Sequence, residues 1–179
     1  DEDYTVKIYN ATKAGELWAT DKPISSKVNK PNVNTASGTF SNDGNRFYFV
    51  QAGADFVSSI YVCDYKDGKW SQPSKLEGSI NGNFVSTQPS YFEENGKQYL
   101  LYASDKPGGQ GKLDLYYTEL TSATTTGKSI NLGRKVNSPD DEVTPYFDPK
   151  TQTLYFSSRW FKALGGFDVF KSTGGLSNL

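Results

Sequence analysis

The sequence predicts an all-β protein, built from tandem four-stranded antiparallel sheets that form the blades of a β-propeller. Three observations support this fold class. The 179 residues are 15% aromatic and include 17 Gly and 8 Pro, a mixture typical of short strands joined by turns. An internal repeat of a little over fifty residues runs through the chain. No stretch of a dozen residues carries an apolar stripe at helical spacing, which excludes a βαβ layout.

The repeat is clearest in four pairs of neighbouring apolar residues. Ile8-Tyr9, Ile60-Tyr61, Leu115-Tyr116 and Val169-Phe170 follow one another at intervals of 52, 55 and 54 residues. An apolar-x-x-x-apolar-Asn element ends at Asn29, Asn81 and Asn137, and an aromatic residue follows each Asn by ten or eleven positions, at Phe40, Phe92 and Phe147. Trp18 and Trp70 each stand nine residues after the Tyr of their pair. These matches predict equivalent positions in successive blades.

Each repeat contains the pattern of a hairpin. Thr39-Phe40 and Phe47 to Val50 flank Asn42-Asp43-Gly44-Asn45, a sequence that supplies the positive-φ positions of a tight turn. Asn95-Gly96 and Asp148-Pro149-Lys150 occupy the same place in the next two repeats. The apolar pair then marks a third strand, and the Trp, where present, marks a fourth outer strand.

Consecutive apolar residues favour a propeller over a sandwich. Phe47 to Val50 and Tyr99 to Tyr102 are apolar at successive positions, so both faces of these strands must be covered, as in a blade between two neighbours. We expect one propeller region over 1–179, with outer strands of a first blade in 1–36, blades in 37–88 and 89–144, and an incomplete blade in 145–179. About three blades are fewer than a closed ring needs, so the chain is expected to be part of a larger ring.

The composition excludes several functions. Nineteen basic and 20 acidic residues leave no basic excess to hold nucleic acid. The absence of His removes the commonest general base and zinc ligand, so no metal site and no cofactor are expected. The single Cys63 lies in an apolar run and is predicted to be a buried, inert thiol. The sequence contains no Met and no transmembrane stretch, and we expect a piece of a longer protein.

Two segments share a further template. Ser104-Asp105 precedes a glycine-rich loop and Asp114-Leu115-Tyr116, and Ser158-Arg159 precedes a second such loop and Asp168-Val169-Phe170. With Asp141 to Phe147, this pattern resembles the TolB-type, WD40-like propeller repeats of envelope proteins in the Bacteroidetes. In that group the propeller commonly precedes an OmpA-like peptidoglycan-binding domain, as in lipoproteins of type IX secretion. The resemblance implies a periplasmic scaffold associated with the outer membrane, with other envelope proteins as partners and peptidoglycan contacts through domains outside this chain.

The glycine-rich loops are predicted to be structural. The loops holding Gly111 and Gly165 join two strands and do not open a helix, so a phosphate site is disfavoured and turn formation is the better explanation. Asp114 and Asp168 stand at strand starts, where a carboxylate can accept hydrogen bonds from loop amides. That role is favoured over calcium binding, since no cluster of oxygen ligands surrounds either residue in the sequence.

Two segments remain as candidate functional sites. Arg159, Trp160, Phe161 and Lys162 combine aromatic and cationic side chains in one loop, a composition enriched at binding hot spots, although packing on the adjacent blade is the alternative. The run Asp140-Asp141-Glu142 could supply a carboxylate pair for glycoside hydrolysis, but acidic runs are usually solvated loops. We therefore expect a non-enzymatic scaffold, with a carbohydrate-binding or glycoside-hydrolysing propeller as the alternative.

Overall fold

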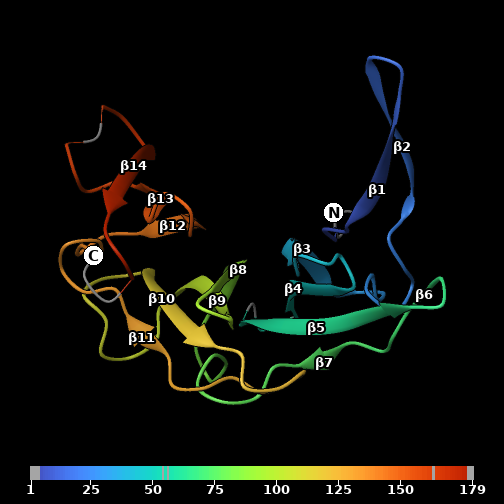
Figure 1. The fold of residues 1–179 in the computed structure, drawn as a ribbon, viewed down its shortest axis with the longest axis horizontal. Helices are drawn as coiled ribbons and strands as arrows, with labels where there is room; N and C mark the ends of the chain where they lie inside the picture. The colour runs from blue at the N-terminus through green and yellow to red at the C-terminus, as the bar shows by residue number, and fades with distance from the viewer. Residues whose placement is uncertain (1–4, 54, 56, 163, 177–179) are drawn as a thin grey trace.

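The computed structural model describes residues 5–53, 55, 57–162 and 164–176 and contains only strands and irregular segments there (Figure 1). Four antiparallel sheets follow one another in the chain. The first is the hairpin of β1 (Tyr9–Ala14) and β2 (Leu17–Pro23). The second holds β3 (Asn34–Phe40), β4 (Arg46–Ala52), β5 (Ser58–Lys66), β6 (Lys69–Trp70) and β7 (Ser74–Lys75). The third holds β8 (Ser86–Glu94), β9 (Lys97–Ser104), β10 (Asp114–Glu119) and β11 (Ile130–Asn131), and the fourth holds β12 (Glu142–Asp148), β13 (Thr153–Ser158) and β14 (Asp168–Thr173).

The sheets are arranged as successive blades along an open arc (Figure 1). Their first strands lie beside one another, with β8 in contact with both β3 and β12. Side chains bond these strands together, because Tyr91 N donates to Thr39 Oγ1 (3.1 Å) and Thr144 N donates to Gln88 Oε1 (2.6 Å). The all-β, antiparallel blade architecture predicted from the repeat is confirmed, and the chain folds as part of a β-propeller.

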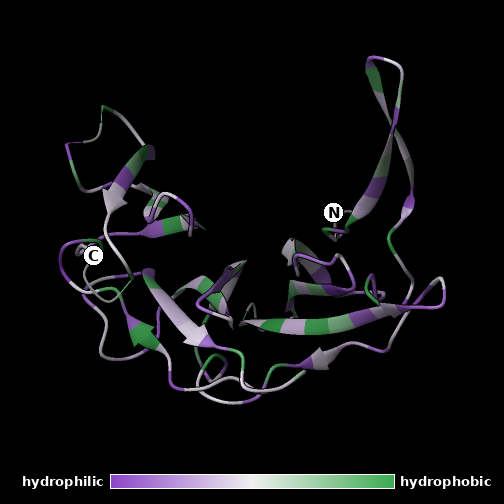
Figure 2. Ribbon diagram, viewed as in Figure 1, coloured by the Kyte–Doolittle hydropathy of each residue, from purple (hydrophilic) through white to green (hydrophobic). Residues whose placement is uncertain are grey.

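Apolar cores fill the spaces between consecutive sheets. In β9, Leu100 packs toward the β3–β7 sheet and its neighbour Leu101 packs toward the β12–β14 sheet. A strand covered on both faces has no solvent-facing side, which explains the runs of consecutive apolar residues. In β5 the hydrophobic middle gives way to hydrophilic residues toward the strand end (Figure 2). Cys63 of β5 is buried as predicted, and burial raises the pKa of its thiol to about 12.

The repeated Asn is a built-in partner for the third strand of each blade. Asn137 Oδ1 accepts a hydrogen bond from Leu115 N (2.8 Å), and Asn137 Nδ2 donates to Leu115 O (3.0 Å). Asn81 makes the same pair of bonds to Ile60, and Asn29 makes them to Ile8. In each blade the Asn side chain therefore bonds the backbone N–H and C=O of the first residue of the apolar pair. It takes the place of a neighbouring strand at that point.

A β-bulge recurs at the same place in the first strand of three sheets. Its first residue has positive φ in each case, at Ser37 (42°), Gln88 (53°) and Thr144 (51°). The residues three positions later are Phe40, Tyr91 and Phe147. The predicted equivalence of Phe92 with Phe40 and Phe147 is therefore wrong by one residue, because the segment before β3 is one residue longer than its counterpart before β8.

The two tryptophans occupy matching positions but different environments. Trp18 pairs with Lys13 and Trp70 pairs with Tyr65, each at the same distance from its blade's Ile-Tyr pair. Trp70 packs near Phe47, with ring centres 6.0 Å apart, whereas Trp18 is 68% exposed. The predicted equivalence of the two tryptophans therefore holds for their position but not for their packing, because the described β1–β2 hairpin has no inner strands beneath it and extends away from the other sheets (Figure 1).

The outer face of the last sheet is open. Tyr146, Tyr155 and Val169 point away from the β8–β11 sheet, and Val169 is 75% exposed. By register, Tyr155 and Val169 correspond to Leu101 and Leu115 of the preceding blade, which are fully buried beneath the β12–β14 sheet. Within the described residues, this face of the last sheet is therefore exposed, whereas the equivalent face of the preceding sheet is buried.

Candidate functional site

The loop between β13 and β14 separates the predicted binding residues into an anchor and an exposed group. Phe161 is half-buried and packs edge-on against Phe156 and Phe170, with ring centres 6.2 and 5.5 Å away. Trp160 is 57% exposed. Arg159 lies over the ring of Phe167, with 4.2 Å between its Cζ and the ring centre, and Lys162 is exposed. Phe161 is thus a packing residue, the alternative considered for this loop. Trp160 and Lys162, on either side of it, are accessible to a ligand.

The glycine-rich loops are held by the aspartates that follow them. Gln110 N donates to Asp114 Oδ2 and Leu164 N donates to Asp168 Oδ2, both at 2.5 Å. A Cβ at Gly111 would stand 2.2 Å from Ser138 O, so only glycine fits that close approach. A Cβ at Gly165 would meet open space. The structure places these four residues in the loop geometry for which a turn role is expected.

The three residues of the acidic run Asp140-Asp141-Glu142 have three different environments. Asp140 pairs with Lys112 (2.7 Å), and Asp141 Oδ1 accepts Leu113 N (3.2 Å). Glu142 is fully buried, where Ser138 N (2.7 Å) and the hydroxyls of Ser138 and Ser158 (2.5 and 2.7 Å) donate to its carboxylate. The interpretation of this run as a solvated loop is wrong for Glu142. The sequence gives no sign of the difference, because the three acidic residues are adjacent.

Glu142 makes the stability depend on pH. Burial raises the pKa of this carboxyl above its ordinary value of 4.5, and the three donated hydrogen bonds only partly offset that rise. The folded state therefore binds the proton more tightly than the unfolded state. Its stabilising contribution is complete below pH 4.5 and is lost as the pH rises through the raised folded pKa.

We expect the Glu142→Gln variant to gain stability relative to the parent as the pH is raised from 4 to 8. A Gln amide can accept Ser138 N and donate to the two serine hydroxyls, which can rotate. Urea unfolding of both proteins across this range measures the difference. A stability difference that does not change with pH would show that Glu142 titrates normally.

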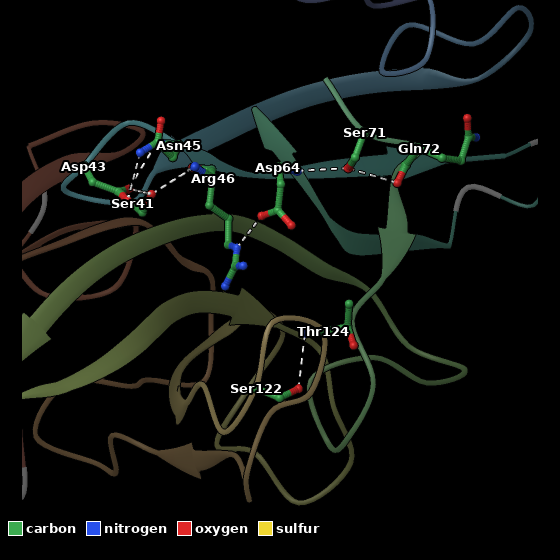
Figure 3. Close-up of polar contacts among 9 residues, drawn as sticks. All are labelled: Ser41, Asp43, Asn45, Arg46, Asp64, Ser71, Gln72, Ser122 and Thr124. Carbon is green, nitrogen blue, oxygen red and sulfur yellow. Dashed lines mark hydrogen bonds and ion pairs between the residues drawn. The ribbon is translucent and has the colours of Figure 1, made fainter. Parts of the chain in front are cut away.

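A polar cleft lies between the second and third sheets, beside the β3–β4 turn. This turn cleft has a volume of about 600 Å³. It is lined by Ser41, Asn42, Asp43, Asn45, Arg46, Tyr48, Asp64, Glu93 and Gln98. Arg46 extends from β4 and its Nε donates to Asp64 Oδ1 of β5 at 2.6 Å (Figure 3).

The turn itself is rigidly hydrogen-bonded. Asp43 accepts bonds from Ser41 Oγ (2.5 Å), Asn45 N and Asn45 Nδ2 (both 3.1 Å), as Figure 3 shows. These bonds, that of Ser41 above all, lower the pKa of the Asp43 carboxyl. Asp43 is therefore held ionised by its own turn, and Asp64 is paired with Arg46.

Tyr48 is the deeply buried residue of the turn cleft. It is fully buried, its ring stacks on Tyr91 with centres 5.8 Å apart, and its hydroxyl has no hydrogen-bond partner among the described residues. Burial raises the pKa of Tyr48, and the nearby Arg46 lowers it again in part. Sequence reasoning missed this cleft because its lining comes from four strands, and only the Asn-Asp-Gly turn is visible as a motif.

Two further searches of the described residues gave negative findings. In these residues no three His, Cys, Asp or Glu side chains come together in a way that could hold a metal ion. Within the same part of the chain, no helix has the length and apolar character needed to cross a bilayer.

Similarity to solved structures places the chain among β-propellers. A thermostable family-43 glycoside hydrolase matches with a TM-score of 0.61 and 15% identity, over 96% of this chain and 64% of that one. An α-L-arabinanase from Penicillium chrysogenum matches with a TM-score of 0.57 and 14% identity, over 96% and 55%. TolB from Acinetobacter baumannii matches with a TM-score of 0.51 and 16% identity, over 88% and 32%. No protein-family model matches the chain, and no curated protein sequence matches it.

These likenesses describe the fold alone. The identities are low, and the chain spans less than two thirds of each of these three structures. They include both TolB and enzymes that act on glycosides, so the fold is compatible with either class of function.

Proposed function

We propose that this chain belongs to a non-catalytic β-propeller scaffold that binds other proteins in a bacterial envelope. The observation that carries the proposal is the loop patch, which consists of Arg159, Trp160, Leu164 and Phe167. Leu164 is 98% exposed and Trp160 is 57% exposed, so two large apolar side chains stand beside an Arg–Phe stack on one loop. Aromatic and Arg side chains of this kind dominate the binding energy of protein interfaces.

The loop that carries the loop patch is held in place by packing and by a hydrogen bond. Phe161 anchors its first half in the core between the last two sheets, and the Leu164 N to Asp168 bond fixes its second half. A loop that is already ordered loses less conformational entropy when a partner binds. The patch therefore has both the side chains and the support that a protein-binding site needs.

The resemblance of residues 37–172 to TolB-type repeats supports a periplasmic location. In such an assembly the propeller would present its loops to outer-membrane or secretion-system proteins, and a separate OmpA-like domain would hold peptidoglycan. The similarity to the TolB fold agrees with this proposal.

The alternative is a carbohydrate-active propeller that uses a carboxylate pair. The arrangement of the carboxylates argues against catalysis. A glycosidase needs one acid with a raised pKa and a second carboxylate facing the same space. Among the described residues, the carboxyl with a raised pKa is Glu142, which is enclosed by Ser138 and Ser158, whereas Asp43 of the turn cleft has a lowered pKa.

We expect no turnover of aryl glycosides, peptides or phosphoesters by the purified protein. The assay is release of a chromogenic leaving group, compared with a matched buffer blank. Glycosidase activity that disappears in both Asp64→Asn and Glu93→Gln variants would overturn the non-catalytic assignment.

Partner binding is tested with two tryptophan variants. When the complete parent protein is used as bait on envelope extract, we expect Trp160→Ala to lose a captured protein that the parent retains. Trp18→Ala is the matched control, because Trp18 is also exposed but lies on the β1–β2 hairpin. Equal capture by the parent and both variants would show that the loop patch is not the binding site.

A further inference from the structure

We propose that the partner of the loop patch presents an acidic segment, in which an Asp or Glu carboxylate binds Arg134 and a neighbouring apolar side chain packs on Trp160. This inference rests on the proposed protein-binding function and names the chemistry of the partner. It is supported by a cleft beside the loop patch, by the charges of the surrounding loops and by the hydrogen bonds that their backbone already makes.

The loop patch borders a cleft between the third and fourth sheets, called here the interblade cleft. Its volume is about 310 Å³, at the lower end of the range for small-ligand sites, so it holds one or two side chains of a partner and not a larger ligand. The loops after β9, β11 and β13 line it, and the lining includes Gln110, Arg134, Asn137, Ser138, Trp160 and Phe161. Trp160 belongs to both the loop patch and the cleft, so a partner that packs on Trp160 lies at the opening of the cleft.

Arg134 is the charged residue that lines the interblade cleft. It is exposed, and its Nε donates to Gln110 Oε1 at 2.9 Å, which orients the guanidinium. Among the described residues, its two Nη atoms have no acceptor and the side chain forms no ion pair. A guanidinium offers parallel N–H donors in the geometry that a carboxylate accepts. Arg134 can therefore bind a carboxylate that enters the cleft.

The loops around the interblade cleft carry an excess of positive charge. Residues 105–113, 132–141 and 159–167 include six basic and three acidic residues, although the whole chain has a net charge of −1. All three carboxylates already have donors, because Asp105 and Asp141 each accept a backbone N–H and Asp140 pairs with Lys112. The acidic residues of these loops therefore do not neutralise the remaining basic ones.

Four basic side chains of these loops form no ion pair with a described residue. They are Arg134, Lys135, Arg159 and Lys162. Complementary charge guides the encounter of two proteins and disfavours wrong partners, so an acidic segment is attracted to this surface and a basic one is repelled. The charge of the loops thus specifies the sign of the partner.

The backbone of the cleft favours a side-chain carboxylate over a chain end. Terminal carboxylates are typically captured by free backbone N–H groups. Here Ser138 N donates to the Glu142 carboxylate at 2.7 Å, and Trp160 N donates to Ser158 Oγ at 3.1 Å. These N–H groups are already used, which leaves the guanidinium of Arg134 as the donor for an acidic side chain.

Exposed apolar side chains beside the cleft favour a protein segment over a nucleic acid. Leu164 is almost fully exposed, and more than half of Trp160 is exposed. A phosphodiester backbone has no apolar side chain to cover them, and a chain with a net charge of −1 is poorly suited to a polyanion. A short segment with an apolar residue next to its Asp or Glu satisfies both the charge and the apolar surface.

The experiment is a titration of the ¹⁵N-labelled protein with the acidic peptide acetyl-Gly-Leu-Glu-Asp-Phe-Gly amide. Binding is followed through the indole N–H signals, of which the three tryptophans give one each. We expect a Kd of about 1 mM or tighter and a shift of the Trp160 signal. Trp18 is the control within the same molecule, because it is exposed on the β1–β2 hairpin and its signal should not move.

Three further probes test the chemistry of the ligand. A neutral peptide, in which Gln and Asn replace Glu and Asp, should bind about tenfold more weakly because it offers no charged acceptor. A polar acidic peptide, in which Ser replaces Leu and Phe, should also bind more weakly, since nothing packs on Trp160. A thymidine octanucleotide supplies negative charge from phosphates and should bind more weakly than the acidic peptide.

Two arginine variants locate the carboxylate. Arg134→Gln should weaken binding of the acidic peptide about tenfold and leave the Kd of the neutral peptide unchanged. Arg46→Gln is the matched control, because it removes the same charge from the turn cleft and should leave both Kd values unchanged. Arg134 is exposed and forms no described ion pair, so its replacement should not lower the thermal midpoint.

Several results would overturn the acidic-partner proposal. These are an unchanged Trp160 signal with the acidic peptide, equal shifts of the Trp18 and Trp160 signals, equal binding of the neutral peptide, tighter binding of the octanucleotide, and equal Kd values for Arg134→Gln and Arg46→Gln. Capture from envelope extract separates this proposal from the function on which it rests. If Trp160→Ala loses the captured protein and Arg134→Gln retains it, the loop patch binds a partner that is not acidic. If Trp160→Ala retains it, the loop patch itself is not the binding site.

Discussion

Replacing Asn137 with Ala should lower the free energy of unfolding by about 2 to 4 kcal/mol. The change removes both hydrogen bonds to the backbone of Leu115 and leaves its N–H without a partner at a buried position, while its C=O keeps the bond from Leu132 N (3.1 Å). Each buried group left unsatisfied costs about 1 to 3 kcal/mol. Asn131 Oδ1 also loses the bond from Asn137 Nδ2.

The change is measured by urea unfolding, with Asn10→Ala as the control. Asn10 is exposed in β1, so its replacement should alter stability by less than about 0.5 kcal/mol. If Asn137→Ala cost no more than the control, the Asn side chain would not be the partner of the third strand, and the explanation of the repeated Asn would fail.

Phe147→Ala should cost about 3 to 5 kcal/mol, because it empties part of the core between the last two sheets. Phe147 is 1% exposed and packs edge-on against Phe92, with ring centres 5.1 Å apart. Its neighbour Tyr146 points to the open face of the same strand, so Tyr146→Ala should cost less than about 1 kcal/mol. Both variants are compared with the parent by thermal and urea unfolding.

This pair tests how the sheets stack. Two adjacent residues on one strand face opposite sides, and only one side is covered by described residues. Equal losses for the two variants would mean that both faces of the last sheet are covered in the protein as measured, by further chain or by a second molecule.

The repeat predicted the fold because each recurring residue has a physical task. Asn29, Asn81 and Asn137 complete the hydrogen bonds of a strand, and Leu100 and Leu101 face different cores. Such tasks require the same residue type at a regular interval, so they are visible in one sequence. The error at Phe92 arose because the position after the bulge accepts either Tyr or Phe. Since the segment before β3 is one residue longer than that before β8, counting from the repeated Asn selected Phe92 in place of Tyr91.

The candidate sites were harder to predict because exposure and long-range contacts leave little trace in sequence. Trp18 and Trp70 match in position, but only the sheet beneath Trp70 makes that residue a packing residue. Glu142 is buried while its neighbour Asp140 pairs with a lysine on the surface. The turn cleft joins residues up to 57 positions apart, from Ser41 to Gln98, so it is visible only in three dimensions.

The most direct test of the scaffold proposal is photo-crosslinking from position 160 in the full-length protein inside the cell that makes it. A photoactivatable phenylalanine replaces Trp160 in one strain and Trp18 in another, since both side chains are exposed. The proposal predicts a discrete adduct with another envelope protein from position 160 and no such adduct from position 18. The absence of any adduct from position 160, or the same adduct from both positions, would contradict it.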